Sequence, residues 1–560
     1  MSITALDGKR FAEMVIQGAN HLAANAKMVD ALNVFPVPDG DTGTNMNLSM
    51  TSGAKEVKKN VQEHIGKVGV SLSKGLLMGA RGNSGVILSQ LFRGFSKSIE
   101  SKGKVDAKEF AAALEAGVET AYKAVMKPVE GTILTVAKDA AKRGVQVANQ
   151  TNDIVLVMEE VLKEAKASLK RTPDLLPVLK EVGVVDSGGQ GLVCVYEGFL
   201  AELKGEKLPD SPDSLPLMDE LVSAEHHKSA QSHMNTEDIV FGYCTEFMVK
   251  FEEDKIKKYP FNEKEFRNDL SQFGDSLLVI SDDDVVKVHI HSEQPGEVLT
   301  YGQRYGSLIN IKIENMRQQH TNIVGETKTP LVTDHPRTSS EKQEYGIVTV
   351  SMGSGIAELF KSIGAHEVIE GGQTMNPSTE DIVNAIKKVN AKKVFILPNN
   401  KNIIMAAEQA AEVSEDEVYV IPSKSVPQGL SALLAFNPST DVQSNEEAMR
   451  DALSHVKTGQ VTFAVRDTQI DGLEIEKDDF MGIAEGKIVV KNKDKGKAAE
   501  ELLTKLLDEG SEILTILYGE DVSWEEVTKL TEFVEENYAG VEIEVHNGNQ
   551  PIYSYIFSIE

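Results

Sequence analysis

The sequence predicts a multidomain protein: a helical domain comes first, a small α+β domain follows, and an α/β domain ends the chain. Its 560 residues are too many for one hydrophobic core, so two to four domains are expected. Apolar residues recur at helical spacing early in the chain, whereas short apolar runs alternate with helical segments late in it. Polar segments at 206–235 and 326–343 are typical of linkers, which leaves domains at 1–205, 236–325 and 344–560.

The first domain is predicted to be mostly helical because it carries three apolar stripes at three- and four-residue steps. The stripes are Phe11, Met14, Val15, Ala19, Leu22 and Ala26; Phe110, Ala113, Leu114, Val118, Ala121 and Val125; and Ile154, Val157, Met158, Val161, Leu162 and Ala165. Such a stripe buries one face of a helix against its neighbours, and Pro128 ends the second helix. A helix bundle is therefore expected.

The two later domains are predicted from strand-like runs. These are 242–251 and 284–291 in the middle domain, and 346–350, 393–398 and 418–422 in the last domain. Because helical segments separate the runs of the last domain, a parallel sheet is favoured there. Gly353-Ser-Gly355 resembles a dinucleotide-binding turn, but Glu358 stands where a third glycine is needed, so a Rossmann site is not expected.

Charge and composition exclude several classes of function. The formal net charge of −28 argues against a nucleic-acid partner and against unassisted docking on an anionic membrane. Cys194 and Cys244 are the only two cysteines, so a disulfide framework is not expected. There is no signal-peptide pattern and no apolar run of about 18 residues. We expect a cytoplasmic protein without a membrane span.

The most informative segment is Asn33-Val-Phe-Pro-Val-Pro-Asp39-Gly-Asp41-Thr-Gly-Thr-Asn45. Two carboxylates lie two residues apart on a glycine-containing turn, and hydroxyl and amide side chains follow them. Oxygen-rich turns of this kind suit Mg²⁺ together with phosphate oxygens. An EF-hand is excluded because Thr44 and Met50 stand where that loop needs glycine and glutamate. A purely structural Asx turn remains an alternative.

A second glycine-rich segment, Gly79-Ala-Arg81-Gly-Asn83-Ser84-Gly85, precedes a helical run that begins at Val86. Glycines allow the backbone to approach a phosphate, and a helix amino terminus attracts anions. The segment lacks the Gly-Lys-Ser/Thr of a Walker A loop. A simple glycine-broken helix boundary is the alternative reading.

Two histidines and a cysteine in the middle domain suggest a zinc site. His289 and His291 alternate with apolar residues, so they lie on one side of a strand, and Cys244 lies in another strand-like run. Imidazole and thiolate ligands favour Zn²⁺. The alternative is two solvent-facing histidines and a buried cysteine.

Three segments resemble the nucleotide-contact motifs of the dihydroxyacetone-kinase L-subunit (DhaL) family: 39–46, 79–85 and Val185-Asp186-Ser187-Gly188-Gly189. The whole chain resembles the bacterial fatty acid kinase A (FakA) family, and this resemblance continues through 235–239 and 371–378. It implies an antiparallel helical barrel for the first domain, with nucleotide at one end. For the last domain it implies the lipid-binding DegV fold.

The resemblance also implies roles for single residues. Asp39 and Asp41 would hold two Mg²⁺ ions that bridge the ATP phosphates, and Asn33 stands near the place of a third family aspartate. The implied nucleotide contacts are Thr42, Thr44, Asn45, Asn83, Ser84, Gly85, Thr132, Asp186 and Gly188. Asp186 and Gly188 would lie on the adenosine side, and Thr132 in a loop over the nucleotide. The resemblance also implies a metal in the middle domain, which supports the zinc site suggested by Cys244, His289 and His291.

The function implied by the resemblance is a fatty acid kinase that phosphorylates a carboxylate. The fatty acid would be presented by a separate carrier protein of the FakB/DegV type, and the acyl phosphate would serve phospholipid synthesis. A dihydroxyacetone or other small-polyol kinase is one alternative, and a non-catalytic lipid-binding regulatory protein is another. We expect a homodimer, with Arg466 as a candidate contact to the carrier; an ordinary surface ion pair is the alternative for this residue.

Overall fold

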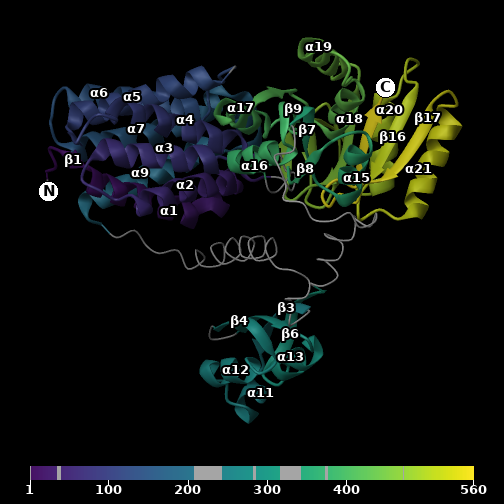
Figure 1. Cartoon of the computed structure of the whole chain (residues 1–560), viewed down its shortest axis with the longest axis horizontal. Helices are drawn as coiled ribbons and strands as arrows, with labels where there is room; N and C mark the ends of the chain where they lie inside the picture. The colour runs from purple at the N-terminus through teal and green to yellow at the C-terminus, as the bar shows by residue number, and fades with distance from the viewer. Residues whose placement is uncertain are drawn as a thin grey trace. The chain divides into compact units, whose positions relative to one another are not determined.

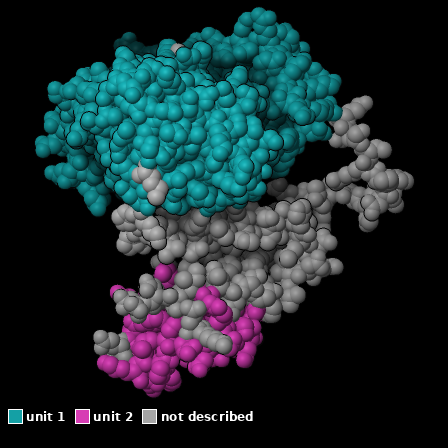
Figure 2. Space-filling view, turned by 90° about the vertical axis from the view of Figure 1, so that its left-hand side faces the viewer, with its two compact units in different colours: residues 1–211, 340–560 teal, residues 212–339 magenta. Residues whose placement is uncertain are grey.

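The computed structural model describes residues 2–34, 40–125, 127–206, 243–281, 285–315, 342–372, 376–470 and 472–560. The chain forms two compact units (Figure 2). One unit combines residues 1–211 with residues 340–560, and the other contains residues 212–339. The predicted fold class, which is helical first, mixed in the middle and α/β last, is confirmed.

The helical part of the first unit is a closed ring of helices. Its elements are β1 (Leu6–Asp7), α1 (Gly8–Asp30), α2 (Thr42–Lys59), α3 (Ile65–Gly79), α4 (Gly82–Ile99), β2 (Lys104–Val105), α5 (Ala107–Ala124), α6 (Ile133–Ala148), α7 (Ile154–Leu175), α8 (Pro177–Val182) and α9 (Ser187–Lys204). From α1 to α7 each helix packs on the next, and α9 packs on both α7 and α1. The predicted stripes form its core, with Phe11, Phe110 and Ile154 fully buried.

The α/β part of the same unit holds two main sheets. Its elements are β7 (Gln343–Ser351), α15 (Ser354–Ser362), β8 (Glu367–Glu370), α16 (Thr379–Val389), β9 (Ala391–Leu397), α17 (Ile404–Val413), β10 (Glu417–Val420), α18 (Val426–Leu434), α19 (Val442–Ala452), β11 (Lys457–Phe463), β12 (Thr468–Ile470), β13 (Leu473–Ile475), β14 (Phe480–Ala484), β15 (Lys487–Asn492), α20 (Lys495–Leu506), β16 (Ile513–Tyr518), α21 (Trp524–Asn537), β17 (Glu542–Asn547) and β18 (Tyr555–Ile559). The first sheet, in the order β10-β9-β7-β8, is parallel as predicted.

The second sheet differs from the prediction. Its order is β15-β14-β11-β18-β16-β17, and its pairs are antiparallel except for β16 with β17. A turn at Glu485-Gly486, with φ values of 48° and 80°, joins β14 directly to β15. Short connections of this kind produce antiparallel neighbours, whereas parallel pairs need a crossover.

The helical and α/β parts of this unit share a core. Ala80, the C-cap residue of α3, and Val86 of α4 belong to one buried cluster with Val348 of β7 and Ile382 and Ile386 of α16. Helices α16 and α17 pack on α3 and α4, and Figure 1 shows them at this boundary. The two parts, although far apart in sequence, therefore form one folded body.

The second unit is a four-stranded antiparallel sheet with helices. Its elements are β3 (Tyr243–Phe251), α11 (Glu253–Lys258), α12 (Glu263–Leu270), β4 (Gly274–Ser281), β5 (Val285–Ser292), α13 (Pro295–Gly302) and β6 (Gly306–Asn315). The strand order is β4-β5-β3-β6, and Phe247, Phe266 and Ile290 lie in its core. Within the described ranges, no helix of the chain has the length and apolar character that crossing a bilayer would require.

Candidate nucleotide and metal site

The first motif forms the amino-terminal end of α2. Asp41 is the N-cap residue, and Thr42 begins the helix. The carboxylate of Asp30, at the end of α1, accepts hydrogen bonds from Gly43 N at 2.6 Å, Thr44 N at 3.1 Å and Thr44 Oγ1 at 2.8 Å. It thus satisfies amides of the first helical turn that have no partner within the helix. Burial raises the pKa of Asp30 above its ordinary value.

Asn33 connects the end of α1 to this helix start. Its Oδ1 accepts from Thr42 Oγ1 at 2.6 Å, and its Nδ2 donates to the Asp30 carbonyl at 2.8 Å. The predicted metal ligand Asp39 lies outside the described residues. Asn33 and Asp41 are therefore the predicted magnesium ligands that the structure places.

The second motif forms a tight turn into α4 beside the first. Gly82 has φ +58°, and a Cβ there would lie 2.7 Å from Nδ2 of Asn45, so glycine is required for conformation and for space. A Cβ on Gly85 would meet Ser49 Oγ at 2.3 Å, which brings the first turn of α4 against α2. The two predicted phosphate segments are thus held side by side.

One cavity of about 610 Å³ opens between these two helix starts and the α/β part. Its size falls in the range of about 300–1,000 Å³ that is usual for ligand sites. The predicted residues that line it are Asn33, Asp41, Thr42, Asn45, Asn83 and Ser84. The sequence reasoning missed the residues of the α/β part that line it, among them 399–402, Lys424 and Gln428.

The remaining predicted contacts do not line this cavity. Thr44 is bonded to Asp30, and Gly85 packs against α2. Thr132 is the N-cap residue of α6, and its hydroxyl donates to the Val129 carbonyl at 2.8 Å. Asp186 and Gly188 lie next to Ser187, which does line the cavity.

Asp186 is the N-cap residue of α9. Its carboxylate accepts from Gly189 N at 2.6 Å, and its own amide donates to Thr172 Oγ1 at 3.1 Å. Burial raises the pKa of Asp186 to about 6, although the hydrogen bonds from the backbone of Gly189 and Ile133 oppose this shift. The segment is therefore fixed at the wall of the cavity by hydrogen bonds on both sides of Asp186.

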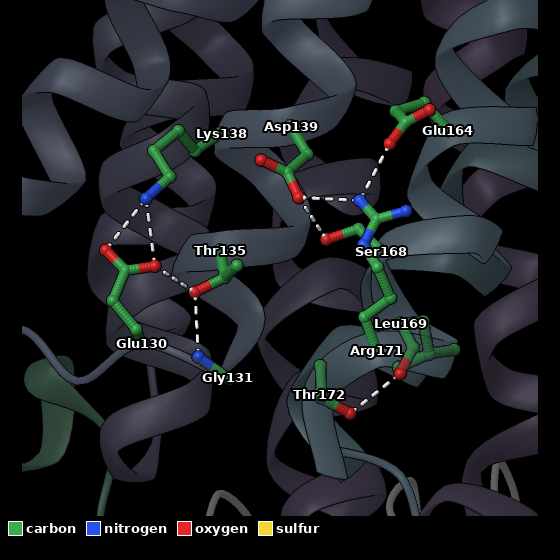
Figure 3. A network of polar contacts seen from close by, with 10 residues as sticks. All are labelled: Glu130, Gly131, Thr135, Lys138, Asp139, Glu164, Ser168, Leu169, Arg171 and Thr172. Atoms are coloured by element: carbon green, nitrogen blue, oxygen red, sulfur yellow. Dashed lines mark hydrogen bonds and ion pairs between the residues drawn. The ribbon is translucent and has the colours of Figure 1, made fainter. Parts of the chain in front are cut away.

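A polar network restrains the loop that contains Thr132 (Figure 3). The Glu130 carboxylate accepts from Lys138 Nζ at 2.8 Å and from Thr135 Oγ1 at 2.6 Å, and Thr135 Oγ1 in turn accepts from Gly131 N at 2.9 Å. The Lys138 ammonium lowers the pKa of Glu130. These contacts hold the 130–132 loop against the first turns of α6.

Around the cavity the α/β part touches both motifs. Nδ2 of Asn376 donates to Oδ2 of Asp41 at 2.6 Å. Arg81 Nη1 donates to the Asn376 carbonyl at 2.8 Å, and its guanidinium lies 3.5 Å from the carboxylate of Asp381. Arg466 donates to the backbone carbonyls of Ala31, Asn33 and Val34. Arg466 thus binds the chain's own first motif.

The residues present fit a hard cation. Among the described residues that line the cavity, none is histidine or cysteine, and the potential ligands are oxygens, among them the carboxylates of Asp41 and Glu485 and the amides of Asn33 and Asn83. Oδ1 of Asn83 and Oδ1 of Asn376 are buried without a donor among the described residues. Oxygen ligands of this kind suit Mg²⁺ better than zinc.

The proposed zinc ligands lie in the second unit. Backbone register places Cys244 of β3 directly opposite His291 of β5, and His289 opposite Glu246. The side chains of Cys244, His289 and His291 lie outside the described part. Among the side chains that are described, no group of three or more acidic, histidine or cysteine residues could hold a metal.

Three family models match the chain. They are the DAK2 domain at residues 36–201, the FakA-like middle domain of fatty acid kinases at residues 240–323, and the FakA-like carboxy-terminal domain at residues 346–560. Protein YloV of Bacillus subtilis is 65% identical over 560 residues, which is 100% of both chains.

Two solved structures show more distant similarity. A DegV family protein from Corynebacterium glutamicum matches 39% of this chain and 97% of its own, at 16% identity and a TM-score of 0.31. The dihydroxyacetone kinase from C. freundii, in complex with AMP-PNP and Mg²⁺, matches 34% of this chain and 33% of its own, at 20% identity and a TM-score of 0.28.

Proposed function

Because the chain belongs to the FakA-like family of fatty acid kinases, we propose that it transfers the γ-phosphate of ATP to the carboxylate of a fatty acid. Membership makes it a phosphotransferase and one component of a fatty acid kinase. The fatty acid is held by a separate lipid-binding protein, and the product is an acyl phosphate for phospholipid synthesis. The observation that carries this proposal is the cavity shared by the first turns of α2 and α4.

The two helix starts bind the phosphates of ATP. The positive ends of their dipoles attract anionic oxygens, and Asn83 and Ser84 add side-chain donors at the first turn of α4. Lys401 and Lys424 line the same cavity and add positive charge. In this proposal the adenosine lies near Asp186 and Gly188, beyond Ser187.

Asp39 and Asp41 hold magnesium in this proposal, and the Asn33 amide oxygen is a further, uncharged ligand. Held there, Mg²⁺ would supply positive charge that neutralises the phosphates. The protein's own residues position ATP and exclude water, which supplies most of the rate in phosphoryl transfer. A carboxylate acceptor is already deprotonated, so no general base is required.

Radiolabelled ATP tests the proposal. The chain should form acyl phosphate when a fatty-acid-loaded carrier is added, and form little with free fatty acid. Asp41→Asn keeps the side-chain shape but removes a charge from the metal site, so the transfer rate should fall at least about 100-fold, equivalent to several kcal/mol in the transition state. Asp174→Asn changes an exposed carboxylate of α7 outside the cavity and is the matched control.

Two results would contradict the proposal. Equal transfer to dihydroxyacetone would favour a small-polyol kinase instead. Undiminished transfer by Asp41→Asn would mean that the cavity between α2 and α4 is not the reaction site.

We also propose that Cys244, His289 and His291 bind one zinc ion in the second unit. The support is the backbone register, because directly opposed residues on neighbouring antiparallel strands share one face of the sheet. Zinc would bring thiolate and imidazole ligands from two strands together and tie β3 to β5.

A further inference from the structure

The segment 376–378 of the α/β part contacts both phosphate motifs. Asn376 reaches Asp41 through its side chain and Arg81 through its backbone carbonyl. Two residues on, Ser378 forms an isolated antiparallel bridge with Arg81, and Thr379 N donates to the Ala80 carbonyl at 3.1 Å. This segment therefore joins the start of α2 to the turn before α4.

The orientation of the Asn376 amide follows from the chemistry of its partner. An ionised carboxylate only accepts hydrogen bonds, so the NH₂ end of Asn376 must face Asp41. Its Oδ1 then points elsewhere and has no donor among the described residues, although Asn376 is only 1% exposed. An unpaired buried amide oxygen lowers stability. Packing of the two parts alone would be served better by an apolar side chain.

We propose that Asn376 is a positioning residue of the kinase site, supplied by the carboxy-terminal domain. Its hydrogen bond to Oδ2 fixes the rotation of the Asp41 carboxylate, which would hold the cation. A hydrogen bond of this kind to a metal ligand orients it and raises metal affinity. The inference rests on the proposed function, because it assumes that Asp41 binds the magnesium of the nucleotide.

Gln409 of α17 provides a comparison at the same boundary. It is 3% exposed, its Nε2 donates to the Leu77 carbonyl at 2.7 Å, and its Oε1 accepts from Ser89 and Gln90. Both ends of this amide are therefore bonded, and none of these partners lines the cavity. Gln409 holds the two parts together, whereas Asn376 acts on a site residue.

The test compares Asn376→Leu with Gln409→Leu in the full chain. Mn²⁺ serves as a paramagnetic probe for Mg²⁺, and its binding in the presence of AMP-PNP is followed by electron paramagnetic resonance. Asn376→Leu should raise the apparent Kd for Mn²⁺ about 10- to 100-fold. Its Tm should stay unchanged or rise, because the unpaired Oδ1 is removed. Gln409→Leu should lower the Tm and leave the Kd within about twofold of wild type.

Loss of metal affinity without loss of stability is the signature of a positioning residue. A Kd for Mn²⁺ within about twofold of wild type in Asn376→Leu would overturn the inference. An equal loss of Mn²⁺ affinity in Asn376→Leu and Gln409→Leu would also overturn it. If Asn376→Leu does not fold, Asn376→Ala removes the same donor without adding bulk. Failure of the wild-type chain to bind Mn²⁺ with AMP-PNP would instead overturn the proposed function.

Discussion

Replacing Asp186 by Asn should change how the stability of the chain depends on pH. Burial raises the pKa of this carboxyl from 3.8 to about 6. The folded state therefore binds the proton more tightly than the unfolded state does. The resulting stabilisation is fully present below pH 3.8 and is lost as the pH rises through 6. A difference of about 2.2 pKa units corresponds to about 3 kcal/mol.

Asparagine resembles the protonated carboxyl because it keeps an oxygen that can accept from Gly189 N. Asp186→Asn should therefore be about as stable as wild type at pH 4 and up to about 3 kcal/mol more stable at pH 7.5. Urea unfolding followed by circular dichroism, at several pH values in this range, measures the difference. Taking variant minus wild type cancels the titration of the other groups.

Asp153→Asn is a matched control with the opposite sign. Asp153 is the N-cap residue of α7 and accepts from Val155 N at 3.0 Å and Ile3 N at 3.1 Å. Its pKa is lowered by these backbone hydrogen bonds, which outweigh the opposing effect of burial. The ionised Asp153 carboxylate stabilises the fold at pH values above the pKa that it has in the unfolded chain. Relative to wild type, Asp153→Asn should therefore become less stable as the pH rises. If the difference in unfolding free energy between Asp186→Asn and wild type does not change with pH, the reasoning is refuted.

Two further outcomes are expected. Asp30→Ala removes the acceptor of three hydrogen bonds at the start of α2, so it should lower the free energy of unfolding by about 2–4 kcal/mol; an unchanged urea midpoint would contradict this. Purified chain should carry about one zinc ion, because one thiolate and two imidazoles form a ligand set that is common in zinc sites, and the zinc should be lost in His289→Ala. Elemental analysis that finds no zinc in chelator-free preparations would exclude that site.

The helices and the first sheet could be predicted because their signals are local. A stripe such as that of Phe11 and Met14 must be buried whatever the rest of the chain does, and both residues are in the core. The antiparallel second sheet could not be predicted in this way. Pairing between β11 and β18 joins residues almost 100 positions apart, and no local pattern specifies it.

The sequence predicted the residues that the helical part contributes to the candidate site, but not those of the α/β part. Asp41 and Asn83 belong to motifs, and both line the cavity. Asp30 was missed because it is an ordinary charge at the end of a helix until the chain turns back at residues 40–42. The polar residues 399–402 follow β9 directly, at the carboxyl end of a parallel strand, where ligands commonly bind in α/β sheets. That signal could have been used.

The shared core of the helical and α/β parts has a consequence for synthesis on the ribosome. Ala80 and Val86 are covered by Ile382 and Ile386, which emerge about 300 residues later. At translation rates of about 5–20 residues per second, the apolar start of α4 waits about 15–60 s for its cover. During that interval the nascent helical ring exposes apolar residues next to the motif at 79–85. A chaperone that binds short apolar segments would therefore find its target on unfinished chains, and release would coincide with completion of the candidate site.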